Sequence, residues 1–576
     1  MAETLLSPGV LARENDSSFL TAQPLQAGAA ILGPTVKGPV VPTVVTTYSQ
    51  YQNTFGTLIQ SGSDYYTYFT SIAAFNYFQN GGDSLLVGRV TNGTYTSATS
   101  SIMATGSGGP STGLAPFVLE TLSKGTIMNT GVTEVGGGAL ATGSTDNVRW
   151  EIVAPNTASG TFSLLIRQGS DTANSRTVLE TWTNLSLDPK ASNYISRVLG
   201  DQTQTVATDG SSYYIQTTGS YNNISAYVRV KSVNYQTPDY FDNTGTAKNQ
   251  FTGSLPIASS GSFNGATGTP FTQRVGKFYD QAGLTANADS QGVTGSDYTT
   301  MLNLLANADE YQYNVISMPG LNRVSSATQI STVVSNAQNR GDNIAVVDVV
   351  PYGSALNTVT GQALGMDTSY GATYWPWVQA ADPTTGNAVW VPASTLIPAV
   401  YAFNDNSTEA WFAPAGFNRG GLSTVVRAER KLAQGDRDSL YQGNVNPIAT
   451  FPNQGVVVFG QKTLQKKASA LDRVNVRRLL ITVKDYISQI ADNLVFEQNT
   501  IATRNSFLAQ VNPYLTSVQQ RQGLYAFKVI MDDSNNTADV IDRNQLVGQI
   551  YLQPTKTAEF IYLDFNLTPT GATFPG

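Results

Sequence analysis

The chain contains no cysteine and no histidine. Without histidine, the sequence excludes Ser-His-Asp triads, Cys-His dyads, imidazole general bases and His-ligated zinc or iron. Without cysteine it excludes the disulfide scaffolds of small secreted proteins. An enzyme built from this chain would be limited to carboxylate, lysine, tyrosine or Ser-Lys chemistry.

Charge is also scarce. Charged residues make up 13% of the 576 residues, against ~25% in ordinary soluble domains. The surface is therefore expected to be covered by Ser, Thr, Asn, Gln and Gly, which suits packing against neighbouring molecules. The net charge of −7 gives no overall attraction to phosphate backbones, so we expect no direct nucleic-acid contact.

Two further features are missing. The first residues lack the basic stretch and apolar run of an export signal, and no run of ~20 apolar residues occurs anywhere. We therefore expect a soluble protein without membrane insertion. Apolar residues at 41% and aromatic residues at 10% still permit extensive burial, and a chain of this length exceeds the ~250 to 300 residues that one core supports. The sequence predicts several folded domains.

Strands and helices alternate in two separate stretches. GAAILGP predicts a buried strand, PTVVTTYSQYQNTFG a strand and a short helix, Tyr65 to Gln79 a helix, and Leu85 to Val90 a strand. The same pattern returns at Tyr313 to Met318, followed by a helix with Ile330, Val333, Val334 and Ala337 on one face, and a strand from Ile344 to Val350. Such alternation predicts a mixed-sheet core of the α/β and α+β multidomain class.

The segment between these stretches differs in composition. From 96 to 265, Ser, Thr, Gly and Asn dominate, and short alternating runs such as TFSLLIRQ and SYYIQTT predict a β-rich insertion of more than one unit. We therefore divide the chain into an N-terminal arm, a first core part, an outer insertion, a second core part, a C-terminal domain and a C-terminal arm: 1–22, 23–95, 96–265, 266–420, 421–555 and 556–576.

One helix, predicted over 471–493, combines an apolar and a basic face. Its apolar stripe consists of Val476, Leu480, Val483, Ile487, Ile490 and Leu494. Arg473, Arg477 and Lys484 recur at offsets of four and eleven residues, which brings them onto a neighbouring stripe, whereas Arg478 lies off it and is expected to be structural. The stripe could be a binding face or a solvated face with ion pairs inside the chain.

Both chain ends have the pattern of strand donors. Ile561, Leu563, Phe565 and Leu567 alternate with Tyr562, Asp564 and Asn566, and this period of two predicts a strand. A short extended segment is expected at Val10, Leu11 and Ala12 in the polar N-terminal arm. A single strand needs a sheet to join, which could belong to the same chain or to a neighbour. Plain terminal disorder is the alternative for the N-terminal arm.

Other motifs give no convincing site. Asp533, Asn535, Thr537 and Asp539 alternate as in a calcium loop, but Ala538 replaces the required glycine and no closing Glu follows, so a turn is favoured. A glycosidase needs a pair of carboxylates. Asp436 with Asp438, or Asp405 with Glu409, could form such a pair, but pairs like these occur by chance in a chain of this size. Trp375 and Trp377 are expected to be buried. We predict no catalytic residues, no metal and no cofactor.

Taken in order, several segments resemble the tail sheath proteins of contractile bacteriophages: SPGVLARE, AAILGPTVKGP, FQNGG with LLVGRV, YWPWV, DRDSLYQGNVNPIATFPNQGVVVFGQKTL, LDRVNVRRLLITVKDYI, FEQNT and AEFIYLDFNLT. The resemblance spans both ends and the α/β stretches between them. It implies a non-enzymatic subunit that polymerises helically around an inner tail tube and contracts to drive the tube through the host envelope. The virion would be its location, after assembly in the host cytoplasm.

The resemblance also implies partners and residue roles. The partners would be further copies of the chain, the inner tube protein, and the baseplate and tail terminator proteins. Arg473, Arg477 and Lys484 would face acidic groups on the tube, and the terminal arms would add strands to adjacent subunits. The sheath of a bacterial contractile injection system is an alternative, and a carbohydrate-binding or carbohydrate-cleaving surface protein is a less favoured one.

Overall fold

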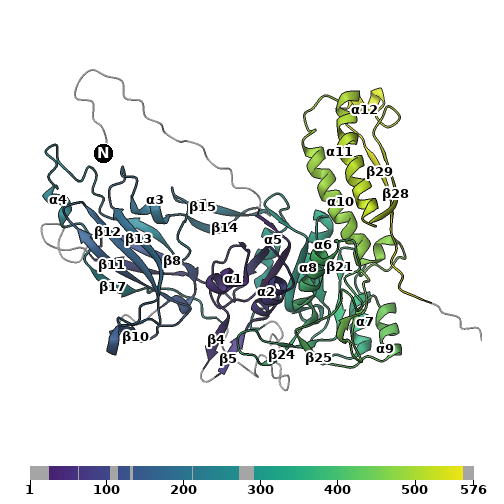
Figure 1. Cartoon of the computed structure of the whole chain (residues 1–576), viewed down its shortest axis with the longest axis horizontal. Helices are drawn as coiled ribbons and strands as arrows, with labels where there is room; N and C mark the ends of the chain where they lie inside the picture. Colours follow the sequence, from purple (N-terminus) through teal and green to yellow (C-terminus); the bar gives the residue numbers. More distant parts are fainter. Residues whose placement is uncertain are drawn as a thin grey trace, which may run out of the picture.

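The computed structural model describes residues 25–61, 64–103, 115–129, 134–210, 212–270 and 291–561. These residues form three regions in a row (Figure 1): a β-rich region, a central sheet covered by helices, and a C-terminal helical region that projects from the body. Among the described residues, no helix is both long and apolar enough to cross a lipid bilayer.

The central sheet has six strands in the order β21-β20-β19-β2-β6-β3. In chain order they are β2 (Ala29–Gly33), β3 (Thr43–Val45), β6 (Leu85–Arg89), β19 (Val315–Asn322), β20 (Ile344–Asp348) and β21 (Gly371–Ala372). All neighbours are parallel except β3, which runs antiparallel to β6 at the edge. Since β2 pairs with β19 across the intervening segment, the prediction of a mixed-sheet core split by an insertion is confirmed.

Alternate residues of β2 face two different cores. Ala29 and Ile31 pack on one side of the sheet, with helices α1 (Tyr48–Phe55), α2 (Phe69–Gln79) and α8 (Ile397–Ser407). Ala30 and Leu32 pack on the other side, with α5 (Thr299–Leu304), α6 (Arg323–Arg340) and α7 (Leu356–Leu364). A parallel sheet needs cover on both faces, and this explains why the runs AAILG and LLVGR are apolar throughout.

The helix expected from Tyr65 to Gln79 begins only at Phe69. Residues Asp64–Thr67 instead form β5, which pairs antiparallel with β4 (Leu58–Ser61). The spacing of Tyr65 and Tyr68 matches a helix, but Tyr and Thr favour strands and a pairing partner lies directly before them. The predicted β-α-β unit of β19, α6 and β20 is present, with Ile330, Val333, Val334 and Ala337 buried.

The β-rich region contains two larger sheets that share one core. One sheet has the order β16-β8-β7 and the other β13-β12-β11-β17, and the core includes Phe117 of the first and Phe162 of the second, whose rings are stacked with centroids 5.5 Å apart. The strands are β7 (Ser97–Ile102), β8 (Phe117–Lys124), β11 (Val148–Asn156), β12 (Thr161–Gln168), β13 (Val178–Ser186), β16 (Val228–Val233) and β17 (Ser259–Ser262). This is a β-sandwich.

A separate hairpin, β14 (Thr203–Asp209) with β15 (Ser212–Thr218), belongs to the same stretch of sequence. Figure 1 shows it reaching from the sandwich toward the central region. Val206, Tyr213 and Ile215 pack against the central core. The insertion is thus held to the body by this hairpin as well as by its two connections.

The part of the chain before the projecting region adds two small sheets. Their orders are β22-β26-β27 and β24-β23-β25. The strands are β22 (Tyr374–Trp375), β23 (Val378–Ala381), β24 (Ala388–Val391), β25 (Val425–Ala428), β26 (Asn446–Phe451) and β27 (Gly455–Val458). Trp375 and Trp377 are buried, at 2% and 5% exposure, as expected.

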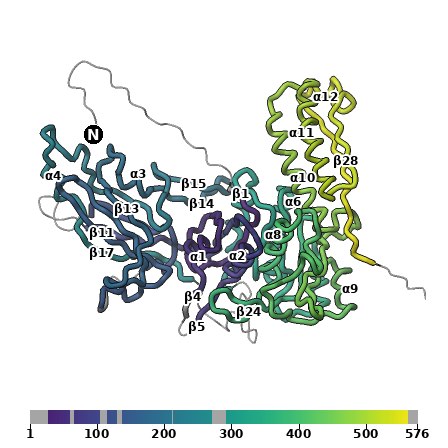
Figure 2. Tube along the Cα trace, viewed as in Figure 1, coloured from purple at the N-terminus to yellow at the C-terminus, as the bar shows by residue number. Residues whose placement is uncertain are grey.

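The projecting region pairs two long helices with one two-stranded sheet. Its elements are α10 (Val474–Asp492), α11 (Ile501–Gln520), β28 (Leu524–Ile530), α12 (Ala538–Asp542) and β29 (Gln549–Pro554). Its core includes Leu479 and Val483 of α10 with Phe507 and Val511 of α11. In Figure 2 the last described segment runs back from this region toward the body.

Candidate functional site

The last described strand ends at Pro554, and the described chain continues to Ile561 without regular structure. The backbone N–H of Thr555 donates to the carbonyl of Gly523 at 3.1 Å. Beyond this point the segment lies against three elements of the body: α9 (Gln434–Gln442), the residues just after β27, and the start of α10. We call residues 555–561 with these contacts the tail anchor.

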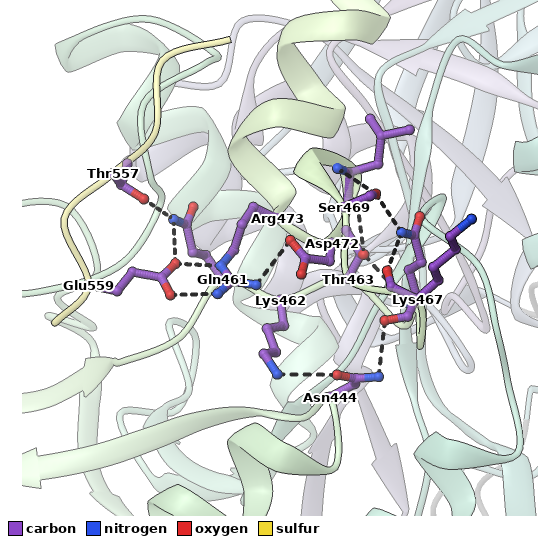
Figure 3. Close-up of polar contacts among 12 residues, drawn as sticks. Asn444, Gln461, Lys462, Thr463, Lys467, Ser469, Asp472, Arg473, Thr557 and Glu559 are labelled. Atoms are coloured by element: carbon purple, nitrogen blue, oxygen red, sulfur yellow. Dashed lines mark hydrogen bonds and ion pairs between the residues drawn. The ribbon is translucent and has the colours of Figure 1, made fainter. Parts of the chain in front are cut away.

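Glu559 is the centre of the tail anchor (Figure 3). Arg473 donates from Nε to Oε1 at 2.7 Å and from Nη2 to Oε2 at 2.9 Å, a two-point ion pair. The hydroxyl of Tyr441 donates to Oε2 at 2.6 Å. Two donors of different elements therefore hold one carboxylate, and such charge-assisted hydrogen bonds are among the stronger ones in proteins.

Gln461 gives the tail anchor a second attachment. Its Nε2 donates to Oγ1 of Thr557 at 2.7 Å and to Oε1 of Glu559 at 3.1 Å. Gln461 is only 3% exposed, so both of these hydrogen bonds are shielded from water. The alternation of Thr557 and Glu559 places both side chains on the same side of the extended segment.

The local sequence explains why Arg473 is held in position. It is the residue before α10 and has an extended backbone, with φ −116° and ψ 135°. Its Nη1 lies 3.1 Å from Oδ1 of Asp472, and its guanidinium lies 5.7 Å from the ring centre of Tyr441. Lys462 lies over the same ring at 4.7 Å. The site is therefore a cationic pocket around one tyrosine, suited to a carboxylate.

The electrostatics favour a charged Glu559. Burial raises the pKa of this carboxyl, but the hydrogen bonds from Arg473 and Tyr441 outweigh burial, so the pKa lies below its ordinary value. Burial, followed by the hydrogen bond to Glu559, raises the pKa of the Tyr441 hydroxyl, which keeps it a donor. Burial and the neighbouring Arg473 lower the pKa of Lys462.

The three basic residues of the predicted stripe have different environments. Arg473 belongs to the tail anchor. Arg477 is 5% exposed, donates to Ser369 and lies 4.0 Å from the ring centre of Tyr370. Lys484, further along α10, is exposed and borders a cavity of about 890 Å³ between α10 and the central sheet. Contact with a tube through these residues stays a prediction.

The reason for this difference is that the first half of α10 is enclosed on more than one side. Leu479 and Ile481 are buried beside Val483, whereas Leu480 of the predicted apolar stripe is only half-buried. Arg478, expected to be structural, is 4% exposed and forms an ion pair with Asp405. A single apolar stripe describes only the second half of the helix.

The predicted strand donors lie mostly outside the described residues. Outside the described residues lie Leu563, Phe565 and Leu567 at the C-terminal end and Val10, Leu11 and Ala12 at the N-terminal end. Ile561 is described, has no strand pairing and is 75% exposed. Strand donation therefore stays a prediction for both ends.

The carboxylates considered for glycoside cleavage have other roles. Asp405 pairs with Arg478, and Glu409 pairs with Arg521 at 2.6 Å. Asp436 accepts from the backbone N–H of Ala433, and Asp438 accepts from Gln434. Within the described ranges, no three acidic side chains are grouped as metal ligands would be.

Sequence reasoning singled out Arg473 but not Glu559, Tyr441 or Gln461. These residues lie far apart in the sequence, and no spacing rule connects them. The available signal was that all four residues lie within segments in which the resemblance was found: Tyr441 and Gln461 in DRDSLYQGNVNPIATFPNQGVVVFGQKTL, Arg473 in LDRVNVRRLLITVKDYI and Glu559 in AEFIYLDFNLT.

The second half of the chain is similar to known protein domains. Residues 291–464 match the phage tail sheath protein central domain and residues 466–568 match the phage tail sheath C-terminal domain. The tail sheath protein of Vibrio phage KVP40 is 38% identical over 240 residues, which cover 41% of this chain and 36% of that protein. The tail sheath protein of Enterobacteria phage T4 is 34% identical over 230 residues, covering 40% and 35%.

The matched part thus spans about a third of the length of these curated relatives. The crystal structure of a sheath tail protein from Listeria innocua is similar in fold across 92% of this chain and 95% of its own, with a TM-score of 0.51 at 12% identity. Residues 291–464 and 466–568 therefore match the phage tail sheath family in sequence, and the fold of the chain is similar to that of a sheath tail protein.

Proposed function

We propose that this protein is the structural subunit of a contractile tail sheath. Copies would assemble helically around an inner tail tube and contract to drive the tube through the host envelope. The observation that carries the proposal is the tail anchor, which fixes the start of a strand-patterned C-terminal arm at one point on the body. A fixed start with an apolar alternating continuation is suited to joining the sheet of another copy.

The described structure also contains a sheet that could accept a strand from another copy. β28 and β29 pair only with each other among the described residues, and a two-stranded sheet is marginal by itself. Its outer face carries Tyr525 and Tyr551, at 64% and 55% exposure. Each outer edge could take one further strand, so we infer that this sheet accepts arms from neighbouring copies.

Contact with the tube is proposed for α10 through Lys484. Arg473 and Arg477 are engaged within the chain, so the exposed ammonium of Lys484 is the member of the stripe available to an acidic partner. Exposed ion pairs contribute about 0 to 1 kcal/mol each. Weak contacts repeated along a polymer would hold a tube and still allow its release. Baseplate and terminator proteins would bind the ends of the polymer.

The decisive experiment removes the arm. Deleting residues 558–576 is expected to abolish polymerisation while leaving a folded subunit with the same cooperative thermal unfolding. Deleting only 569–576 keeps Glu559 and the alternating segment, and is expected to leave polymers intact. Normal tubes from the longer deletion would contradict strand donation by the C-terminal arm.

Negative-stain microscopy separates this function from the alternatives. A sheath forms hollow, regular tubes, whereas a carbohydrate-binding or carbohydrate-cleaving protein would give dispersed particles. Among the described residues, no contact favours the carbohydrate-binding or carbohydrate-cleaving alternative. The sheath of a bacterial contractile injection system would also form tubes, and only the source of the assembled particles distinguishes it from a phage tail.

A further inference from the structure

Three phenylalanine side chains form an exposed cluster beside the tail anchor. Phe417 and Phe451 have ring centroids 5.1 Å apart, Phe417 and Phe459 are at 5.7 Å, and Phe451 and Phe459 are at 4.8 Å. Phe417 is 50% exposed and Phe459 is 39% exposed. Single exposed apolar residues are ordinary, but contiguous aromatic rings at a surface mark an interaction site. We call these residues the phenylalanine cluster.

Two connections place the phenylalanine cluster next to the tail anchor. Phe459 precedes Gln461, which holds Thr557 and Glu559, by two residues. On α9, the guanidinium of Arg437 lies 5.3 Å from the ring centre of Phe451. Tyr441, one helical turn later on the same face, binds Glu559.

The described chain ends at Ile561, two residues beyond Glu559, with Phe560 and Ile561 exposed at 69% and 75%. The next residues continue the apolar alternation with Leu563, Phe565 and Leu567. An extended residue spans ~3.3 Å, so Leu563, Phe565 and Leu567 can lie at most ~7, ~13 and ~20 Å from Ile561.

We propose that the apolar side of residues 562–567 docks on the phenylalanine cluster of its own chain and keeps the arm on the free subunit until assembly. The occupant is the chain's own arm because Glu559 tethers it at the cluster. A short tether gives an effective concentration on the order of millimolar, above that of a second copy in dilute solution. Release of the arm on assembly rests on the proposed function. While the arm is docked on its own chain, it cannot add a strand to a neighbouring copy.

Disulfide trapping tests the contact, and the chain contains no cysteine of its own. The pair F459C with F565C is expected to close within the monomer at least about tenfold faster than F459C with D564C, since Asp564 lies on the opposite side of the alternating segment. Peptide mapping identifies the disulfide that forms, and non-reducing electrophoresis shows whether it lies within one chain or between two copies. Equal rates for the two pairs, or closure only between two copies, would overturn the proposal.

A second variant avoids cross-linking. The exposed substitutions F417S and F459S together are expected to speed amide hydrogen exchange in residues 562–567 by about tenfold, with unchanged exchange in β2 and β19. Unchanged exchange in the arm would overturn the docking.

The trapped monomer separates this inference from the proposed function. It is expected to form no tubes until the disulfide is reduced. If the F459C with F565C pair closes selectively but the oxidised protein still polymerises, the docking stands and strand donation fails. If deletion of 558–576 abolishes tubes but trapping shows no preference between Phe565 and Asp564, strand donation stands and the docking fails.

Discussion

Arg473 and Glu559, 86 positions apart in the chain, form a two-point ion pair with N···O distances of 2.7 and 2.9 Å. Through this pair the residue that begins a long helix fixes the segment that precedes the C-terminal arm. The contact is partly buried, with 24% of the Arg473 side chain and 18% of the Glu559 side chain exposed. It is accessible enough to be opened without unfolding the body.

Replacing Glu559 by Gln is expected to loosen the tail anchor. The amide keeps the size of the side chain but loses the charge that accepts from Arg473, and a hydrogen bond to a charged group contributes about 1.5 to 3 kcal/mol. Amide exchange in residues 555–561 should become at least about tenfold faster. Glu497, exposed in the loop after α10, provides the matched control E497Q, which should leave this exchange unchanged. An unchanged rate in E559Q would contradict the anchoring role.

Acid is expected to open the tail anchor. The pKa of Glu559 is lower in the bound state than its ordinary value of 4.5, so its contribution is fully present above that value. The contribution is lost as the pH falls from there through the bound pKa. Fluorescence anisotropy of a dye on A572C should decrease over this range while far-ultraviolet circular dichroism stays constant. In E559Q the same decrease should be absent, and a decrease of equal size there would show that another group titrates.

The buried charges of the β-sandwich allow a test of whether it unfolds independently of the central sheet. Asp171 is fully buried, 2.7 Å from Nε of Arg167 and 3.5 Å from Nη1 of Arg149. D171N would remove the carboxylate paired with the buried Arg149 and one of the two carboxylates paired with Arg167, which keeps Glu151, and is expected to destabilise the sandwich by about 3 to 5 kcal/mol. Hydrogen exchange should become faster in β11 and β12 but not in β2 or β19. The exposed D209N serves as the control, with an effect within about 0.5 kcal/mol.

Reversing the charge of Lys484 tests the proposed tube contact. K484E is expected to impair assembly around the inner tube more than assembly of empty tubes, because only the former brings α10 against an acidic surface. K431E changes an equally exposed lysine far along the chain and should affect neither. If K484E impairs both kinds of assembly equally, Lys484 has a structural role instead.

The central sheet was predictable because its signals are local. Strands buried on both faces are continuous apolar runs, as in AAILG and IAVVD, and α6 has its buried side chains at helical spacing. The start of α2 was not predictable by the same reasoning. Tyr65 matches the helical spacing, yet Asp64–Thr67 pairs with Leu58–Ser61, and a spacing pattern contains no information about such a partner.

The candidate site was predictable only in part. The sequence directed attention to Arg473 because basic residues recur along α10, but Arg477 on the same stripe is buried against Tyr370. A helical stripe predicts which side chains share a direction and does not reveal what lies there. Glu559 meets Tyr441 and Gln461 only through the tertiary fold, so no pattern within one segment could have identified the tail anchor.

The position of Arg473 directly before α10 has a mechanical consequence. Any tension applied to the C-terminal end of the chain passes first to Glu559 and from it to the residue before this helix, ahead of the β28–β29 pair. The pull is then directed along a rigid rod packed against α11. A load between copies would move the helical region as one unit and leave its internal packing intact.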